Sequence, residues 1–218
     1  MNIAIIGAGN VGGALGRSWT KAGHRVIYGV RDQQAEKTKV LLAATGDDAV
    51  AASPAEAVQA AEWVALATPW NATESAVRSV GADAWRGKAV IDCTNPLQFT
   101  PGVGLELALG FSDSGAENVA RWATGATVVK AFNTYGWENF ADARYPNAAG
   151  LRPVMFIASD DAVAKMQVTR LAEELGFEGF DAGGLRAARE LEPLALIWIR
   201  SAMSGARTPH FTWARLTR

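Results

Sequence analysis

Short apolar runs alternate with longer amphipathic segments along most of the chain. The runs are rich in β-branched residues and lack the strict apolar–polar alternation of a sheet with one solvated face, so they indicate strands covered on both faces. The expected strands are residues 2–6, 25–30, 62–67, 87–92, 126–132, 153–158 and 177–181. The segments with helical periodicity are 11–22, 33–44, 54–60, 71–80 and 160–175. This order predicts an α/β fold with a doubly wound, mostly parallel sheet.

Two stretches depart from this alternation. The segment 97–118 is rich in glycine and turn residues, and we expect a mobile loop near a ligand site there. From residue 183 the sequence GGLRAARELEPLALIWIRSAMSG has a helical apolar pattern, in which Pro193 should kink or divide the helix. The expected organisation is thus an α/β domain, 1–182, and a small helical C-terminal region, 183–218. The apolar side of that region should pack on the domain or, as we favour, on a second copy of the chain in a homodimer.

A glycine-rich turn follows the first expected strand. In IIGAGNVGG, the residues Gly7, Gly9 and Gly12 have the spacing G-x-G-x-x-G between a strand and a helix. In that setting the first glycine permits the tight turn, the second lets the backbone approach a pyrophosphate, and the third lets the helix pack on the strand. The free N–H groups at the start of the helix, at Asn10 and Val11, would face the phosphates. The turn predicts a dinucleotide-binding (Rossmann) domain.

The end of the second expected strand favours NADP over NAD. In such folds a carboxylate roughly 20 residues past the glycines binds the ribose 2′-hydroxyl of NAD, whereas an arginine accommodates the 2′-phosphate of NADP. Here Gly29 has no side chain and Arg31 offers a planar, permanently charged guanidinium. Asp32 could pair with Arg31 or hold the ribose itself, although it stands where the next helix should be capped. A surface position for Arg31 without a ligand is the alternative.

Two later strands should end at the same edge of the sheet, where open α/β sheets bind their ligands. They end in the sequences LATPW and IDCTNPL. Thr68, Pro69 and Trp70 are expected to flank the nicotinamide, with Asn95 and Pro96 beside them. Each of these residues could instead belong to a turn or cap a helix.

Composition and charge narrow the class of protein. Of the 218 residues, 49% are hydrophobic and 20% are charged, and the formal net charge is -1. These values are typical of a soluble globular protein and imply no nucleic-acid or membrane partner. The single cysteine, Cys93, allows no intramolecular disulfide and should be a buried apolar residue. Because the chain starts without a basic leader and no apolar run approaches the roughly 20 residues that span a bilayer, we expect a cytoplasmic protein.

The sequence offers little acid–base chemistry. The two histidines, His24 and His210, have no plausible partner for catalysis, and no spacing fits a metal site. Lys130, in VVKAFNT, is a candidate proton donor or equally a structural ion-pair partner. A redox partner that is itself a two-electron carrier needs no acid or base from the protein, which has only to hold two rings face to face and exclude water. We therefore assign no catalytic residue.

The motifs GAGNVGGALG, VIYGVRD, LATPW, VVKAFNT, PVMFIASDD and DAGGLRAARELEPL together resemble the NADP oxidoreductases dependent on coenzyme F420, a family that includes NADPH-dependent F420 reductases. The resemblance extends over essentially the whole chain, and the last two motifs are its more specific part. It implies NADP(H) on the glycine turn and a deazaflavin stacked on the nicotinamide, in a cleft roofed by the C-terminal region. Arg31 matches a phosphate-binding arginine and the loop Thr68 to Trp70 matches the nicotinamide loop. Unlike archaeal members, the chain lacks an additional Gly-Thr in the turn and has Val30 in place of a serine.

The identity of the redox partner stays open at this point. Coenzyme F420 is favoured, but AFNTYGWENF is more similar to the reductase domains of membrane ferric reductases, which use NADPH and a flavin. One alternative is an NADPH-dependent reductase of a flavin, a ferric chelate or a small carbonyl or imine substrate, the last with Lys130 or Tyr135 as proton donor. A second alternative is a non-catalytic NADP-sensing module. Asn133 and Thr134 are candidates for the acceptor pocket, or for capping a short helix near 136–140. Basic residues available for the anionic tail of F420 are Arg186, Arg189, Arg200 and Arg207.

Overall fold

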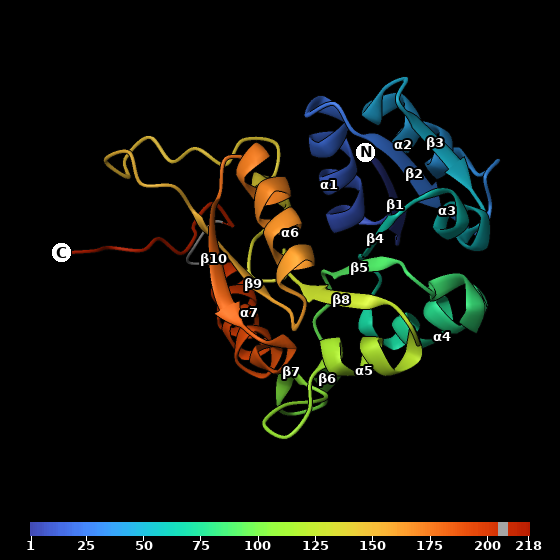
Figure 1. Cartoon of the computed structure of the whole chain (residues 1–218). Coiled ribbons are helices and arrows are strands. Elements are labelled where there is room, and N and C mark those ends of the chain that lie inside the picture. Colours follow the sequence, from blue (N-terminus) through green and yellow to red (C-terminus); the bar gives the residue numbers. More distant parts are fainter. Residues whose placement is uncertain (205–208) are drawn as a thin grey trace.

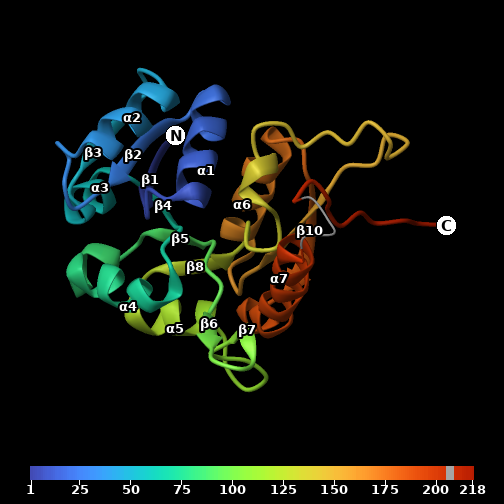
Figure 2. The ribbon, with the colours of Figure 1, turned by 180° about the vertical axis from the view of Figure 1, so that it is seen from behind.

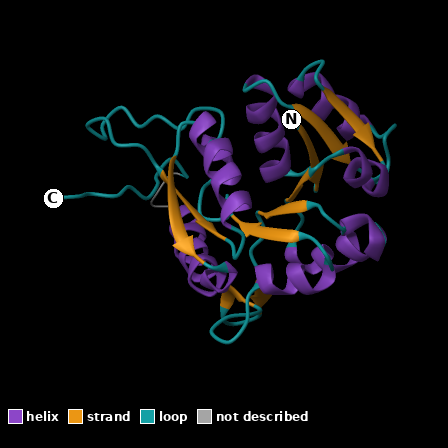
Figure 3. Ribbon diagram, viewed as in Figure 1, coloured by secondary structure: helices purple, strands orange, loops and turns teal. Residues whose placement is uncertain are grey.

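The computed structural model describes residues 1–204 and 209–218, and strands alternate with helices along most of this length (Figures 1 and 3). The strands are β1 (Asn2–Ile6), β2 (Arg25–Gly29), β3 (Ala49–Ala52), β4 (Trp63–Leu66), β5 (Ala89–Asp92), β6 (Leu97–Thr100), β7 (Gly104–Leu107), β8 (Thr127–Lys130), β9 (Val154–Ala158) and β10 (Glu178–Gly183). The α-helices are α1 (Asn10–Lys21), α2 (Glu36–Thr45), α3 (Pro54–Ala60), α4 (Trp70–Ser79), α5 (Gly115–Trp122), α6 (Ala162–Glu174) and α7 (Ala188–Met203). The short 3-10 helices are η1 (Ala82–Trp85), η2 (Trp137–Asn139) and η3 (Leu185–Ala187).

The order of the strands reverses beside β1. In the described residues an eight-stranded sheet has the order β10-β9-β8-β5-β4-β1-β2-β3. The strands from β3 to β8 in this order run parallel, β9 is antiparallel to β8, and β10 is parallel to β9. The predicted doubly wound, mostly parallel fold is therefore confirmed. Its topological switch point lies between the carboxyl ends of β1 and β4, which is where such sheets bind ligands.

Alternate residues of each central strand enter cores on opposite faces of the sheet. Ile3 and Ile5 of β1 pack with residues of α1 and α6, whereas Ala4 and Ile6 pack with residues of α3, α4 and α5. Because both faces are covered, the strands can be apolar at every position. This is why the apolar runs located most of the sheet from the sequence.

The segment expected to be one mobile loop contains regular structure instead. β6 and β7 form an antiparallel hairpin, with Leu97 opposite Leu107. α5 then begins, and the Ser114 side chain caps it by accepting a hydrogen bond from the N–H of Glu117. The expectation was wrong because four-residue strands and an eight-residue helix are too short to show clear periodicity.

Pro193 does not divide α7, which is continuous from Ala188 to Met203. The proline removes one backbone donor, but Leu191 and Ala195 on either side of it are buried, so tertiary packing maintains the helix. Figure 2 shows α7 beside the β6–β7 hairpin. Ile197 remains exposed on its outer side. Of the helices in the described ranges, none has the length and apolar character that crossing a bilayer requires.

Candidate functional site

A cleft of about 1770 Å³ opens at the carboxyl edge of the sheet, across the switch point. It extends from the glycine turn after β1 to the C-terminal half of α7. Ten of the residues singled out in the sequence line it: Gly7, Gly9, Asn10, Val11, Arg31, Thr68, Pro69, Trp70, Asn95 and Asn133. Gly12, Pro96 and Thr134 are buried or packed nearby and are not among the lining residues that the structure describes. Segments far apart in the sequence thus meet at one cleft.

The glycines of the turn differ in what surrounds them. Gly7 has a φ of +108°, and a Cβ there would lie 2.5 Å from the carbonyl carbon of Ala67. A Cβ at Gly12 would collide with the carbonyl oxygen of Gly7, so this glycine is what lets α1 pack against the turn. Gly9, the N-cap of α1, has no atom within 4 Å of such a Cβ. The open space at the start of α1 fits a pyrophosphate held by backbone N–H groups.

The end of the cleft beyond β2 is cationic. A Cβ at Gly29 would lie 2.4 Å from the terminal methyl of Ile6, so a carboxylate at that position would require Ile6 to move. The Asp32 carboxylate accepts hydrogen bonds from the N–H groups of Gln34 (2.9 Å) and Ala35 (3.1 Å) and thereby closes the turn before α2. Within the described residues it makes no ion pair with the exposed Arg31, which lines the cleft.

Lys37, in the first turn of α2, lines the same end of the cleft as Arg31. The sequence analysis missed this residue, because a single lysine on an exposed helix is unremarkable without the path of the chain. Asp32 also lines this end, so two cations stand against one carboxylate and leave the net positive charge that favours a phosphate.

The loop after β4 leads directly into α4. The hydroxyls of Thr68 and Thr73 lie 2.9 Å apart, and Thr73 donates to the carbonyl of Pro69. Trp70 is the first residue of α4, and its ring packs on Trp122 of α5 with centroids 5.5 Å apart. The loop is therefore held in place from both sides, with one face toward the cleft.

Asn95 and Asn133 bond to each other across the ends of β5 and β8. The Nδ2 of Asn133 donates to Asn95 Oδ1 (3.0 Å) and to the carbonyl of Leu191 (3.2 Å), which fixes the orientation of this amide. Its Oδ1 is buried without a partner among the described residues. The alternative that Asn133 or Thr134 caps the following helix is wrong, because the N-cap of η2 is Gly136 and no side chain bonds there.

The other end of the cleft is largely aromatic. Its lining side chains come from β6, the loop after β8, η2 and α7: Phe99, Phe132, Tyr135, Trp137, Trp198 and Met203. Trp198 is held by a hydrogen bond to the carbonyl of Phe211 (3.0 Å) and by stacking on that ring at 5.2 Å. Glu138 is a charged side chain at this end, and its Oε2 is buried without a partner among the described residues.

Neither candidate proton donor is placed to act in the cleft. Lys130 is fully buried and bonds to Asp92 and Glu192, so the ion-pair interpretation of this lysine is confirmed. Tyr135 lines the cleft, but its hydroxyl lies between the carbonyl of Asn139 (3.5 Å) and the hydroxyl of Tyr145 (3.2 Å). Burial raises the pKa of the Tyr135 hydroxyl, which keeps it protonated.

The two histidines and the cysteine are not placed for acid–base chemistry in the cleft either. His24 lies 2.7 Å from Glu174 and His210 lies 2.6 Å from Asn139, so both histidines have polar partners that the sequence did not reveal, although neither lines the cleft. Cys93 does line the cleft, and burial raises the pKa of its thiol.

None of the described arginines proposed for an anionic tail lines the cleft. Arg189 forms a two-pronged ion pair with Glu117 (2.7 and 2.9 Å), and Arg200 donates to the carbonyl of Leu105. Arg186 is exposed. Arg207 lies outside the described residues.

Comparisons with known proteins agree with this arrangement. The family model "NADP oxidoreductase coenzyme F420-dependent" matches residues 2–96. A crystal structure of a candidate F420-dependent NADP-reductase from Arthrobacter sp. FB24 is 31% identical, with a TM-score of 0.89 and 100% of both chains covered.

The chain is also similar to the metalloreductase STEAP3 of Rattus norvegicus and, in fold, to a reductive aminase from Aspergillus terreus. The first is 30% identical over 195 residues, 89% of this chain and 36% of the relative, so the chain spans about a third of the length of that protein. The second, solved with NADPH and ethyl levulinate, is 19% identical with a TM-score of 0.65 over 94% of this chain and 61% of its own, and shows a likeness of fold alone. On the full-length match to the Arthrobacter protein, the chain belongs to the family of NADP oxidoreductases dependent on coenzyme F420 and is an NADP-dependent oxidoreductase.

Proposed function

We propose that the chain transfers a hydride between NADPH, bound at the glycine turn and Arg31, and coenzyme F420, bound at the aromatic end of the same cleft. The volume of the cleft carries this proposal. A site for one drug-sized ligand measures roughly 300–1000 Å³, whereas this cleft measures about 1770 Å³. It has room for a dinucleotide and a second large, planar molecule end to end.

The chain's own residues supply binding and orientation for the dinucleotide. The start of α1 at Gly9 would hold the pyrophosphate, and Arg31 with Lys37 would hold the 2′-phosphate. The loop at Thr68 would hold the nicotinamide against the wall formed by Asn95. When bound, NADPH supplies the hydride, and water exclusion by the aromatic walls protects the transfer.

The aromatic end suits a ring that needs no proton from the protein. The reaction NADPH + F420 + H⁺ → NADP⁺ + reduced F420 takes its proton from solvent, whereas a carbonyl or imine needs a placed donor, and Lys130 and Tyr135 are engaged elsewhere. Asn133 and Glu138 line the cleft, and their polar side chains would lie beside the N–H edge of the ring. A flavin has a similar edge, and the name of the metalloreductase relative makes a ferric chelate a further acceptor to test.

The test is to mix purified protein with NADPH and, in parallel, F420, FMN, a ferric chelate or no acceptor, and to follow nicotinamide absorbance. We expect rapid oxidation with F420 only, and a slower rate when NADH replaces NADPH. Faster turnover with FMN or the chelate would contradict F420 as the partner. Tight NADPH binding without turnover of any acceptor would instead favour an NADP-sensing module.

A further inference from the structure

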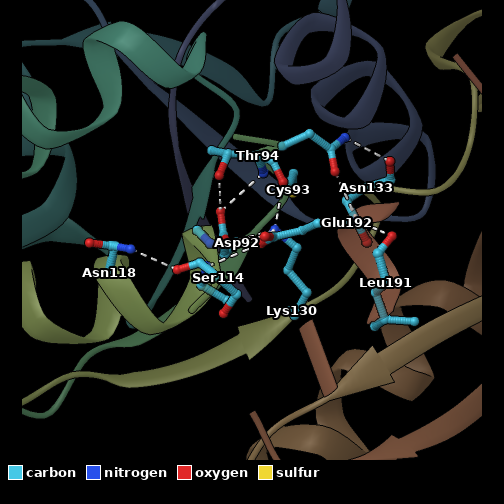
Figure 4. A network of polar contacts seen from close by, with 12 residues as sticks. Asp92, Cys93, Thr94, Ser114, Asn118, Lys130, Asn133, Leu191 and Glu192 are labelled. Atoms are coloured by element: carbon cyan, nitrogen blue, oxygen red, sulfur yellow. Dashed lines mark hydrogen bonds and ion pairs between the residues drawn. The ribbon is translucent and has the colours of Figure 1, made fainter. Parts of the chain in front are cut away.

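Three fully buried charged residues form an ion-pair cluster behind the cleft (Figure 4). The Nζ of Lys130 lies 2.9 Å from Asp92 Oδ2 and 2.8 Å from Glu192 Oε1. Asp92 ends β5, Lys130 ends β8, and Glu192 belongs to α7. Lys130 also donates to the carbonyl of Thr94, and Asp92 accepts from the N–H and hydroxyl of Thr94. The cluster thus joins two strand ends of the dinucleotide site to the C-terminal helix.

The cluster holds two carboxylates for one ammonium, and its surroundings offset the difference. Burial, the largest single effect, lowers the pKa of Lys130. Asp92 and Glu192 together raise this pKa by more than burial lowers it, so the lysine stays charged. Burial raises the pKa of Glu192 despite the nearby lysine. Glu192 also accepts from the N–H groups of Gly115 (2.9 Å) and Ala116 (3.2 Å), the positive end of α5.

Such a cluster is a poor way to gain stability alone. Burying charged groups has a desolvation penalty that their mutual attraction often fails to exceed, and apolar replacements of similar volume are frequently neutral or stabilising. A function in fixing geometry accounts better for a fully buried triad at this position.

A second bond connects the same elements beside the cluster. Asn133, which lines the cleft, donates to the carbonyl of Leu191, the residue before Glu192. Further along α7, Trp198 and Met203 also line the cleft. An α-helix rises about 1.5 Å per residue, so Met203 lies roughly 16 Å from Glu192 along the axis of the same helix. Anchoring α7 near Glu192 therefore fixes the position of its C-terminal half.

We propose that the Asp92–Lys130–Glu192 cluster is a positioning device that fixes the α7 wall of the cleft relative to the β5 and β8 wall, and so sets the distance and angle between hydride donor and acceptor. The proposal rests on the proposed function. None of the three residues is among the described lining residues, so each acts through others. Misplacement of reacting groups by about 1 Å can slow a reaction roughly 100-fold. NADPH affinity should change little, because the glycine turn and the cationic end of the cleft, which the cluster does not contact, supply most of it.

The test is Glu192→Gln, with Glu117→Gln as the matched control. Both changes remove a carboxylate from the α5–α7 contact, but the Glu117 carboxylate bonds to Arg189 and Ser114 and has no hydrogen bond or ion pair with β5 or β8 among the described residues. We expect Glu192→Gln to lower kcat at least about tenfold, to raise the primary isotope effect with 4-deuterated NADPH, and to leave the Kd for NADPH within about twofold. Glu117→Gln should leave all three unchanged.

Two further measurements test the positioning role: kcat of a triple variant and amide exchange in α7. The triple variant Asp92→Asn, Lys130→Met, Glu192→Gln removes the charges together, so it should fold even if Glu192→Gln does not, and it should show the same loss of kcat. Amide exchange in residues 194–203 needs no acceptor and should be faster in either variant than in Glu117→Gln. If the wild type reduces no acceptor, the proposed function fails, and the exchange result alone decides the positioning role. Unchanged exchange, or unchanged kcat and isotope effect in a folded variant, would overturn it.

Discussion

Replacing Arg31 with alanine should weaken NADPH binding far more than NADH binding. Arg31 lines the cationic end of the cleft, and no described carboxylate pairs with it, because Asp32 is hydrogen-bonded to the turn before α2. The guanidinium is therefore available to a 2′-phosphate, which NADH does not have. The change removes no internal contact that the structure describes, so stability should stay the same.

The size of the effect follows from the chemistry of the pair. A hydrogen bond to a charged group contributes about 1.5–3 kcal/mol, which is roughly a factor of 10 to 150 in Kd. Arg31 is exposed and Lys37 remains beside it, so screening and the second cation place the loss near the lower limit. We expect the Kd for NADPH to rise about 10- to 30-fold and the Kd for NADH to change less than about twofold, with a smaller effect at high salt.

The assay is titration of both nucleotides against the wild type, Arg31→Ala and Lys39→Ala at two salt concentrations. Lys39 is an exposed cation of the same helix as Lys37 but does not line the cleft, so it controls for loss of general charge. An equal loss of affinity for NADPH and NADH in Arg31→Ala would refute the assignment of a 2′-phosphate site. An equal loss in both variants would show that only overall charge is involved.

Three more predictions concern the turn, the aromatic wall and the thiol. Gly12→Ala should lower the free energy of unfolding by about 1–3 kcal/mol, because the new Cβ collides with the Gly7 carbonyl. Gly9→Ala should leave Tm unchanged and weaken NADPH binding. Thermal melts and NADPH titrations of both variants check these outcomes. Trp198→Ala should raise the acceptor KM about fivefold, by loss of roughly 1 kcal/mol of ring contact, with an unchanged NADPH Kd, and Trp198→Phe should restore most of it. Cys93 should react with iodoacetamide only after denaturation, because burial raises the pKa of its thiol; rapid alkylation of the native protein would contradict this.

The fold could be predicted where burial on two faces made the strands uniformly apolar. β1, β2, β5 and β9 were all located in this way, to within a few residues. β3 was missed because AVAA is a short, alanine-rich strand at the edge of the sheet. The β6–β7 hairpin and α5 were missed because none of them is long enough for a periodic pattern. The misses therefore share one cause, which is that short elements form through tertiary contacts rather than through local pattern.

The two ends of the cleft also differ in how far local sequence pattern reveals them. The dinucleotide end is made mostly of backbone and of one loop after each strand, so the positions of Gly7, Gly9 and Arg31 were readable from local spacing. The sequence analysis missed Lys37, because this residue lines the cleft only where the turn closed by Asp32 brings α2 to the edge of the sheet.

The aromatic end is made of side chains that meet only through long-range packing. Phe99 comes from the hairpin, Trp137 from η2 and Trp198 from α7, and no local motif connects these segments. What brings them together is the anchoring of α7 to the strand ends, by Glu192 on Lys130 and by Asn133 on Leu191. If this anchoring sets the acceptor geometry, relatives with the same glycine turn can differ in acceptor through changes in α7 and the hairpin alone. Exchanging residues 97–107 and 188–203 with those of a relative that uses another acceptor should therefore change acceptor preference without changing the preference for NADPH, whereas a change in nucleotide preference would contradict the separation of the two ends.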